Sequence, residues 1–128
     1  MKNKISTSRV RPEDIEIRAE NISHSYSGTF KAVENVSFDI KGCRITGLLG
    51  ANGAGKSTLM NIICGALTPT SGDVFINGHS IRTDSVNAKK QIGFLPQKPP
   101  LLTDLTVEEY LRYAANLRMV NGVGKAVD

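Results

Sequence analysis

Apolar and polar residues alternate in two stretches near the start of the chain, at 15–22 and at 36–40. Such alternation is typical of strands with one buried face, so both stretches are predicted to be strands. The mostly polar residues 21–31 are predicted to form a loop, and Lys41-Gly42 a turn. The short apolar run 44–49 is bounded by glycines, which indicates a central strand that is buried on both faces.

Helical and strand signals then follow in alternation. A helix is predicted from about Lys56 to Gly65, because apolar residues recur there at helical spacing. Asn77-Gly78 separates two short apolar stretches and predicts a hairpin, since a type I′ turn needs positive φ at both central residues. Asp84 is expected to cap a short helix that ends near Lys90, and residues 92–95 are predicted to be a further strand.

The last helix has a clear start signal. Thr106 and Glu109 have the spacing of a capping box, and Leu105 and Tyr110 that of a hydrophobic staple. Glu108 is expected to pair with Arg112 on the exposed side. The apolar stripe, which is expected to contact the core or a partner, is Val107, Tyr110, Leu111, Ala114 and Leu117.

Length and composition describe one ordinary globular domain. The chain has 128 residues, and its net charge of +4 is mild and without runs of like charge, so nucleic acid is not expected as a partner. The start, 1–12, is polar and is no secretory signal. No apolar run approaches the roughly 20 residues that span a bilayer, so any membrane role would need a partner protein.

Cysteines and histidines suggest no metal site. Cys43 and Cys64 have no metal-ligand spacing and are expected to be small buried residues in a reduced, cytosolic protein. His24 and His79 are expected to lie on the surface, without a catalytic role.

Residues 50–58 match the phosphate-binding pattern G-x-x-x-x-G-K-[ST], between an apolar run and a helix. Glycines let the backbone curl so that its N–H groups converge on phosphate oxygens, and the helix N-terminus adds partial positive charge. Lys56 is expected to reach the β- and γ-phosphates, Ser57 to bind Mg²⁺ and Thr58 to bind the α-phosphate. The expected ligand is ATP with Mg²⁺, and the expected binding residues are Gly50, Asn52, Gly53, Ala54, Gly55, Lys56, Ser57 and Thr58.

Two further residues have two interpretations each. Tyr26 is either a partly buried loop residue or a ring that stacks on adenine. Gln97 directly follows the strand predicted at 92–95, where ligands bind in open α/β sheets. It is either an ordinary loop residue or a contact to Mg²⁺ or a water molecule.

Together these residues resemble the ATP-binding subunit of ABC transporters, from about Ile15 onwards. The phosphate loop has the form G-x-N-G-A-G-K-S-T, which is usual in that family. The other matching stretches are Tyr26 with Ala32-Val33 and Val36-Ser37-Phe38, Ser71-Gly72-Asp73, Ile76-Asn77-Gly78, Ile92 to Gln97, and Thr106 to Leu111. The amino-acid sequence around Gln97 and in the last predicted helix is similar to that of exporters of the ABC-2 type, including gliding-motility ATP-binding proteins.

The resemblance implies an α/β fold of the P-loop NTPase class, with an ABC ATPase-like RecA-type core and an antiparallel β hairpin, here incomplete. Residues 1–12 would be a disordered leader, and 13–104 the nucleotide-binding core with A-loop, P-loop and Q-loop. Residues 105–128 would begin the helical subdomain and end in a frayed tail. By the same resemblance Tyr26 stacks on adenine, and Gln97 contacts Mg²⁺ and the attacking water.

The family role is ATP hydrolysis that drives transport through a separate membrane protein. Lys56 and Gln97 are therefore the expected catalytic residues, and Ser57 and Gln97 the expected metal ligands. The implied partners are ATP, a transmembrane subunit that Gln97 helps to couple, and a second ATP-binding subunit in a homodimer. The implied location is cytoplasmic, peripheral at the inner face of the cell membrane.

The sequence departs from the family in what it lacks. It contains no LSGGQ signature, no apolar run ending in the Asp-Glu of Walker B, and no switch histidine beyond them. We therefore expect the N-terminal half of a longer domain, without useful ATPase activity on its own. The alternatives are a soluble ABC protein acting on ribosomes or DNA, a non-catalytic nucleotide-binding module that regulates a partner, and a small-molecule P-loop kinase, against which the hairpin before the P-loop argues.

Overall fold

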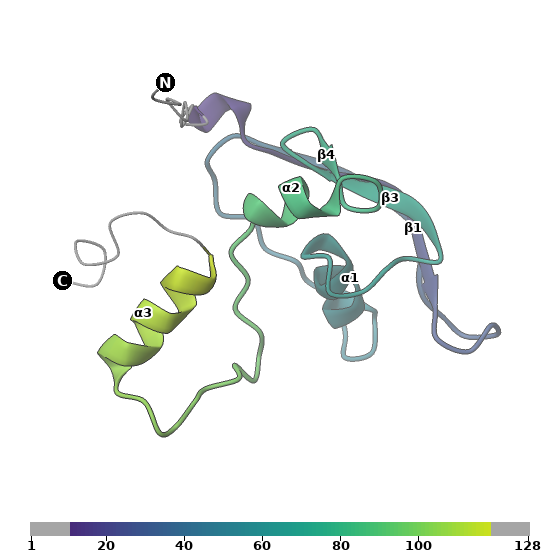
Figure 1. Ribbon diagram of the computed structural model, residues 1–128. Helices are drawn as coiled ribbons and strands as arrows, with labels where there is room; N and C mark the ends of the chain where they lie inside the picture. Colours follow the sequence, from purple (N-terminus) through teal and green to yellow (C-terminus); the bar gives the residue numbers. More distant parts are fainter. Residues whose placement is uncertain (1–10, 119–128) are drawn as a thin grey trace. The chain divides into compact units, whose positions relative to one another are not determined.

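The structure, a computed structural model, describes residues 11–118. These residues form two compact units, and the boundary lies between Gly93 and Phe94. The first unit contains the short 3-10 helix η1 (Pro12–Asp14), all four strands and helices α1 and α2, and the second contains α3 (Figure 1). Most of the predicted leader and the predicted frayed tail lie outside the described residues.

The sheet of the first unit has four strands, β1 (Glu16–Ser25), β2 (Lys31–Lys41), β3 (Ser71–Ile76) and β4 (His79–Ser80). Their order is β2-β1-β3-β4, and every neighbouring pair is antiparallel. The two strands predicted from alternation at 15–22 and 36–40 are therefore confirmed.

Strand β1 continues further than predicted. It contains an irregularity that interrupts the alternation of apolar and polar residues from which the strand was predicted. Asn21 has a positive φ of 49°, and the pairing of β1 with β2 shifts its register between Ala19 and Ile22. The Asn21 backbone N–H donates to the Ser37 hydroxyl (2.8 Å) instead of to the ladder. A bulge of this kind reverses the alternation, so that Ala19 and then Ile22 and His24 are buried. The prediction of a loop from Asn21 is wrong, because the loop is limited to residues 26–30.

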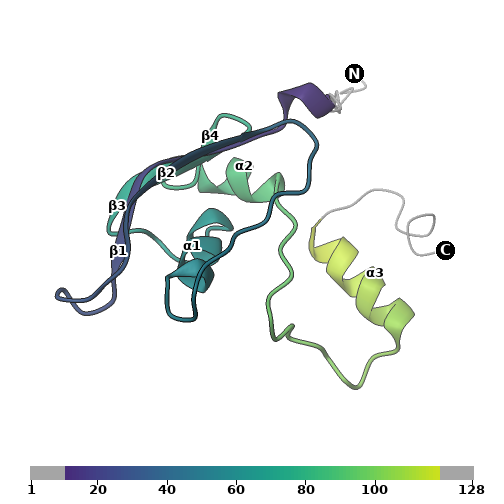
Figure 2. The same cartoon turned by 180° about the vertical axis from the view of Figure 1, so that it is seen from behind.

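Helices α1 (Lys56–Ile63) and α2 (Ser85–Lys90) lie on the same side of this sheet (Figures 1 and 2). The core lies between them and the sheet, and its largest fully buried side chains are Ile22, Ile62 and Val74. Full burial of such side chains stabilises the fold by roughly 1.5–3 kcal/mol each. The apolar spacing that predicted α1 is thus explained by packing of the helix into the core that covers the sheet.

The Asn77-Gly78 hairpin is confirmed. Asn77 and Gly78 have φ values of 49° and 82°, as a type I′ turn requires. The Asn77 side chain also accepts a hydrogen bond from the Glu16 backbone N–H (2.9 Å), which attaches the turn to β1.

Asp84 lies at the N-cap position of α2, as predicted, but its side chain makes no capping hydrogen bond. Its carboxylate instead lies 2.6 Å from His79 Nδ1 and accepts a hydrogen bond from Asn87 Nδ2 (2.8 Å). The hydrogen bond to His79 holds the pKa of Asp84 below its ordinary value.

His79 is partly exposed, whereas His24 is buried, so the surface prediction for His24 is wrong.

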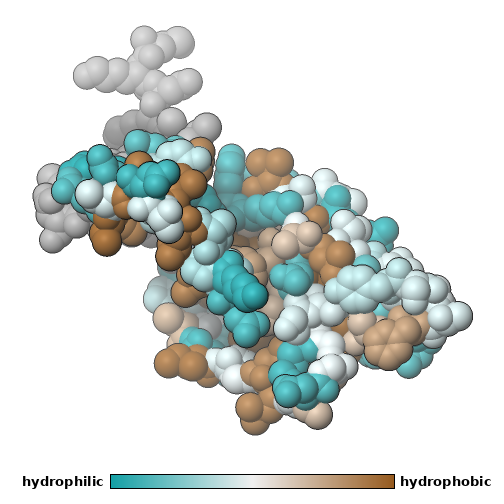
Figure 3. All heavy atoms as spheres, turned by 90° about the horizontal axis from the view of Figure 1, so that it is seen from below, coloured by the Kyte–Doolittle hydropathy of each residue, from teal (hydrophilic) through white to brown (hydrophobic). Residues whose placement is uncertain are grey.

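Neither the central strand predicted at 44–49 nor the further strand predicted at 92–95 is a strand in the structure. The run 44–49 and residues 92–95 belong to no ladder of the described sheet. Leu49, for example, is 93% exposed, and Figure 3 shows hydrophobic side chains at the surface. The physical reason is that a strand buried on both faces needs neighbours and covering layers, and an apolar run by itself supplies neither.

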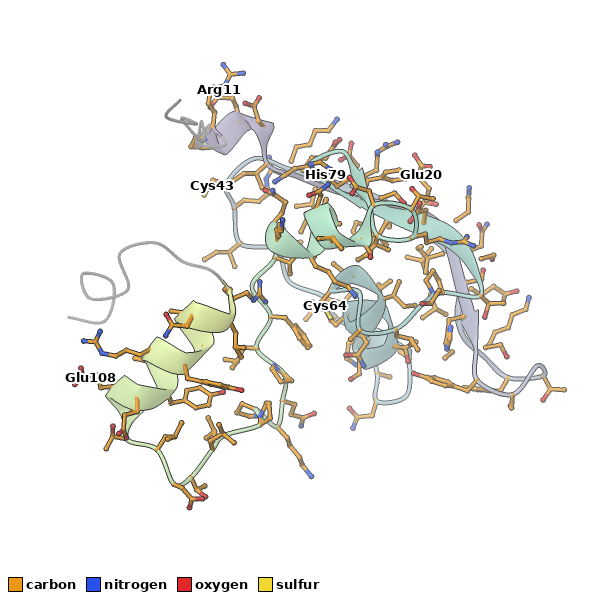
Figure 4. The ribbon with its side chains drawn as sticks, in the orientation of Figure 1. Arg11, Glu20, Cys43, Cys64, His79 and Glu108 are labelled. Atoms are coloured by element: carbon orange, nitrogen blue, oxygen red, sulfur yellow. The ribbon has the colours of Figure 1, made fainter. Side chains whose placement is uncertain are left out.

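The two cysteines lie in different parts of the first unit (Figure 4). Cys64 follows α1, is half-buried and donates to the Asn61 carbonyl (3.4 Å). Cys43 follows β2 and is exposed, so the prediction of burial is wrong for it, because the apolar run after it is not packed.

The second unit consists of a loop and α3 (Val107–Leu117). The predicted capping box is confirmed, since the Glu109 N–H donates to Thr106 Oγ1 (3.3 Å) and the Thr106 N–H donates to Glu109 Oε2 (2.8 Å). These bonds hold the pKa of Glu109 below its ordinary value. The Glu108–Arg112 ion pair (2.9 Å) is also confirmed.

None of the helices described in residues 11–118 is long and apolar enough to cross a membrane.

Candidate functional site

The glycine-rich segment 50–55 leads directly into α1, as the sequence predicted. Gly53 and Gly55 have φ values of 81° and 91°, which side-chain-bearing residues rarely adopt. Gly55 also lies against β2, because a Cβ atom there would be 2.1 Å from the Ala32 carbonyl oxygen. The loop is therefore curled by its glycines and held close to the sheet.

The first turn of α1 offers hydrogen-bond donors. Leu59 donates its N–H to the Gly55 carbonyl (2.8 Å). The N–H groups of Lys56, Ser57 and Thr58 precede it in the first turn, where a helix has no acceptor of its own. A row of such donors with the positive end of the helix dipole is suited to an anion.

Lys56 folds back over the loop. Its ammonium group donates to the Gly50 carbonyl and to the Ala51 carbonyl, the latter at 2.7 Å. The positive charge is thus held beside the same backbone that presents the N–H donors. Gly50 and Ala54 shape the loop without lining the pocket that it borders.

That pocket has a volume of about 330 Å³ and two chemically different ends. One end is apolar and is formed by Tyr26, Phe30 and Ala32 of β2 and of the loop before it. The other end is formed by the glycine-rich loop and α1, through Asn52, Gly53, Gly55, Lys56, Ser57 and Thr58. An aromatic and apolar end joined to an anion-binding end matches a base and its phosphates.

Tyr26 connects the two ends. Its side chain is 63% exposed, and its hydroxyl is hydrogen-bonded to Thr58 Oγ1 at 3.1 Å. The ring of His24 packs against it at right angles, with 4.7 Å between the ring centroids.

Sequence reasoning proposed Tyr26 but missed Phe30 and His24. A prediction of the β1 bulge, from Asn21 in an otherwise strand-like stretch, would have placed His24 on the inner face.

Gln97 lies in the second unit, in the loop before α3, and is exposed. Its contact with the metal and with water stays a prediction. Residues 11–118 contain no group of three or more His, Cys, Asp or Glu side chains that could hold a metal ion.

The fold and this loop define the class as a P-loop nucleotide-binding domain. The sequence model of the ABC transporter family matches residues 33–127, three quarters of the chain. The chain therefore belongs to the ABC transporter family, as an ATP-binding domain, and the predicted class is confirmed.

Individual relatives agree with this assignment. The chain is 38% identical over 111 residues to the probable multidrug ABC transporter ATP-binding protein YbhF of Escherichia coli (strain K12), which covers 87% of this chain and 19% of that protein. A solved ATP-binding subunit of an ABC transporter is 31% identical, with a TM-score of 0.74, over 83% of this chain and 44% of that one. A dimeric ATP-binding cassette in a post-hydrolysis state, bound to ADP and Pi, is 29% identical with a TM-score of 0.69, over 80% and 47%. The chain thus spans less than half of the proteins and structures it matches here.

Proposed function

We propose that this chain binds Mg²⁺-ATP in the pocket between Tyr26 and the glycine-rich loop, as part of the ATPase of an ABC transporter. The observation that supports this most directly is the pocket itself, which joins an apolar aromatic end to the first turn of α1. ATP has the same division into a flat base and a charged triphosphate.

Most residues of the pocket have a defined task in this proposal. The N–H groups of Gly55 to Thr58 bind the β-phosphate, and Lys56 exchanges its loop carbonyls for β- and γ-phosphate oxygens. Ser57 binds the Mg²⁺ ion, which would screen the triphosphate charge, and Thr58 binds the α-phosphate. Tyr26 stacks on the adenine ring, and Phe30 bounds the same end of the pocket. Gln97 is the proposed contact to the metal and to water, as the family resemblance implies.

The whole protein would hydrolyse ATP and drive transport through a separate transmembrane subunit, at the cytoplasmic face of the membrane. The family membership supports this role. A solved relative is dimeric and bound to ADP and Pi, which supports a second ATP-binding subunit as partner. The matches to transporter components favour this role over the soluble and regulatory alternatives. The finer assignment to ABC-2 type exporters rests on the sequence resemblance.

Calorimetry with Lys56→Ala tests the binding site. We expect this variant to lose most of the ATP affinity, because a charge-assisted bond to phosphate is removed from a site with few other cations. Lys90→Ala is the matched control, since Lys90 is exposed in the last turn of α2 and lies outside the pocket. Equal ATP affinities for the wild type and Lys56→Ala would refute the proposed site.

A further inference from the structure

His24 is a buried imidazole that the proposed function leaves without a task. Its residue exposure is 8%, and both of its ring nitrogens are buried without a hydrogen-bond partner in the described part of the chain. His79, by contrast, places its Nδ1 against the Asp84 carboxylate. Buried polar groups are nearly always hydrogen-bonded, so an unpaired imidazole is unfavourable for stability and calls for another explanation.

The contacts of His24 point towards the pocket. His24 pairs with Val33 in the β1–β2 ladder, and the bulge at Asn21 turns it to the buried side. Its ring meets the Tyr26 ring at an interplanar angle of 84° and a centroid distance of 4.7 Å. This edge-to-face arrangement is one of the two that aromatic quadrupoles favour.

Tyr26 would otherwise be free to turn. It is the first residue of the loop 26–30 and is 63% exposed, so the surrounding protein restricts it little. Two interactions determine its orientation, the His24 ring beside it and the Thr58 hydroxyl at its tip. A ring that already presents one face loses less conformational entropy when a base stacks on it.

We propose that His24 is a positioning residue for the nucleotide base, which it serves by holding the Tyr26 ring in the orientation that receives adenine. This inference rests on the proposed function, because it requires that Tyr26 bind the base. It also explains why an unpaired imidazole is retained in the core, since an aliphatic residue would pack there but would not orient the ring.

Titration of ATP and of inorganic triphosphate into His24→Leu and His24→Phe separates positioning from folding. Triphosphate occupies only the P-loop end, so it reports on the integrity of the fold. We expect His24→Leu to bind ATP about twofold to tenfold more weakly, the range expected for one aromatic contact, with triphosphate affinity unchanged. We expect His24→Phe to retain ATP affinity, because it keeps an aromatic ring at this position. His79→Leu, the matched removal of a histidine outside the pocket, should leave both affinities as they are.

Two further measurements complete the test. The melting temperature of His24→Leu should be at least that of the wild type, because the variant removes an unpaired polar group from the core. In the unaltered chain, NMR should detect a nuclear Overhauser effect between the His24 and Tyr26 rings, and its absence would overturn the inference whatever the variants do.

The outcomes are distinguishable. Equal losses of ATP and triphosphate affinity in His24→Leu would mean a structural role and would overturn the inference, as would unchanged ATP affinity. A loss in His24→Phe as large as in His24→Leu would also overturn it, because ring packing would then not be the cause. A wild-type chain that binds triphosphate but gains nothing from the adenosine part would instead refute the proposed base site.

Discussion

Gly53 and Gly55 offer a matched pair for testing how the P-loop is built. Both have positive φ, 81° and 91°, so alanine at either position meets the same backbone penalty. Their surroundings differ, however. A Cβ atom at Gly55 would lie 2.1 Å from the Ala32 carbonyl oxygen, whereas one at Gly53 would have nothing within 4 Å.

The magnitudes follow from these two terms. The left-handed conformation costs a non-glycine residue roughly 1–2 kcal/mol, which applies to both variants. Gly55→Ala must in addition move the loop or β2 by about 1 Å or more to restore a normal contact distance. Overpacking of this kind typically costs about 1–3 kcal/mol. We therefore expect destabilisation of about 1–2 kcal/mol for Gly53→Ala and about 2–5 kcal/mol for Gly55→Ala.

Thermal unfolding followed by circular dichroism measures the difference. For domains of 60 to 250 residues 1 kcal/mol shifts the melting temperature by roughly 2–8 °C, so Gly55→Ala should unfold at a lower temperature than Gly53→Ala. ATP binding should weaken in Gly53→Ala and be lost in Gly55→Ala, because a shift of Gly55 also displaces the N–H groups of the first helical turn. Equal melting temperatures for the two variants would refute the close approach of Gly55 to β2.

Three other predictions concern the base contact, turnover and assembly. Tyr26→Ala should reduce ATP binding by about 0.5–1.5 kcal/mol in calorimetry, whereas Tyr26→Phe keeps the ring and should cost little binding; a large loss with Phe would mean that the hydroxyl bonded to Thr58 is essential. The purified chain should not release phosphate continuously, because Lys56, Ser57 and Gln97 are only part of the groups that phosphoryl transfer needs; sustained release that Lys56→Ala abolishes would contradict this. The chain should self-associate, because the apolar run 44–49 and the exposed side chains Val107, Leu111 and Leu117 of α3 can bury apolar surface at about 25 cal/mol per Å² in a dimer. Light scattering that finds only a 13.8 kDa monomer at high micromolar concentration would refute this.

Local interactions account for the elements that sequence patterns predicted well. The Asn77-Gly78 turn, the Thr106–Glu109 capping box and the helix after the glycine-rich loop depend on residues close together in the chain. Their backbone preferences and hydrogen bonds are therefore readable without knowledge of the fold. The P-loop residues belong to the same group, because the loop and the helix that it begins are continuous.

Other features depended on contacts between distant segments. The run 44–49 has the composition of a buried strand, but a strand forms only where a neighbour takes its hydrogen bonds, and the described sheet offers it none. Cys43 is exposed for the same reason. Residues 21–25 are mostly polar and looked like a loop, yet β2 and β3 pair with them on either side and make them part of β1.

By itself the sequence determined the class of the protein and the phosphate end of its proposed site, because a P-loop is defined by contiguous residues whose conformations and donors are local. Only the tertiary structure decided the base end. The bulge at Asn21 reverses the alternation of β1, buries His24, and sets its ring against Tyr26, while the Tyr26 hydroxyl reaches Thr58 across 32 positions of the chain. Such contacts arise from the register of paired strands and the packing of a helix against them, and no pattern within a single segment specifies either one.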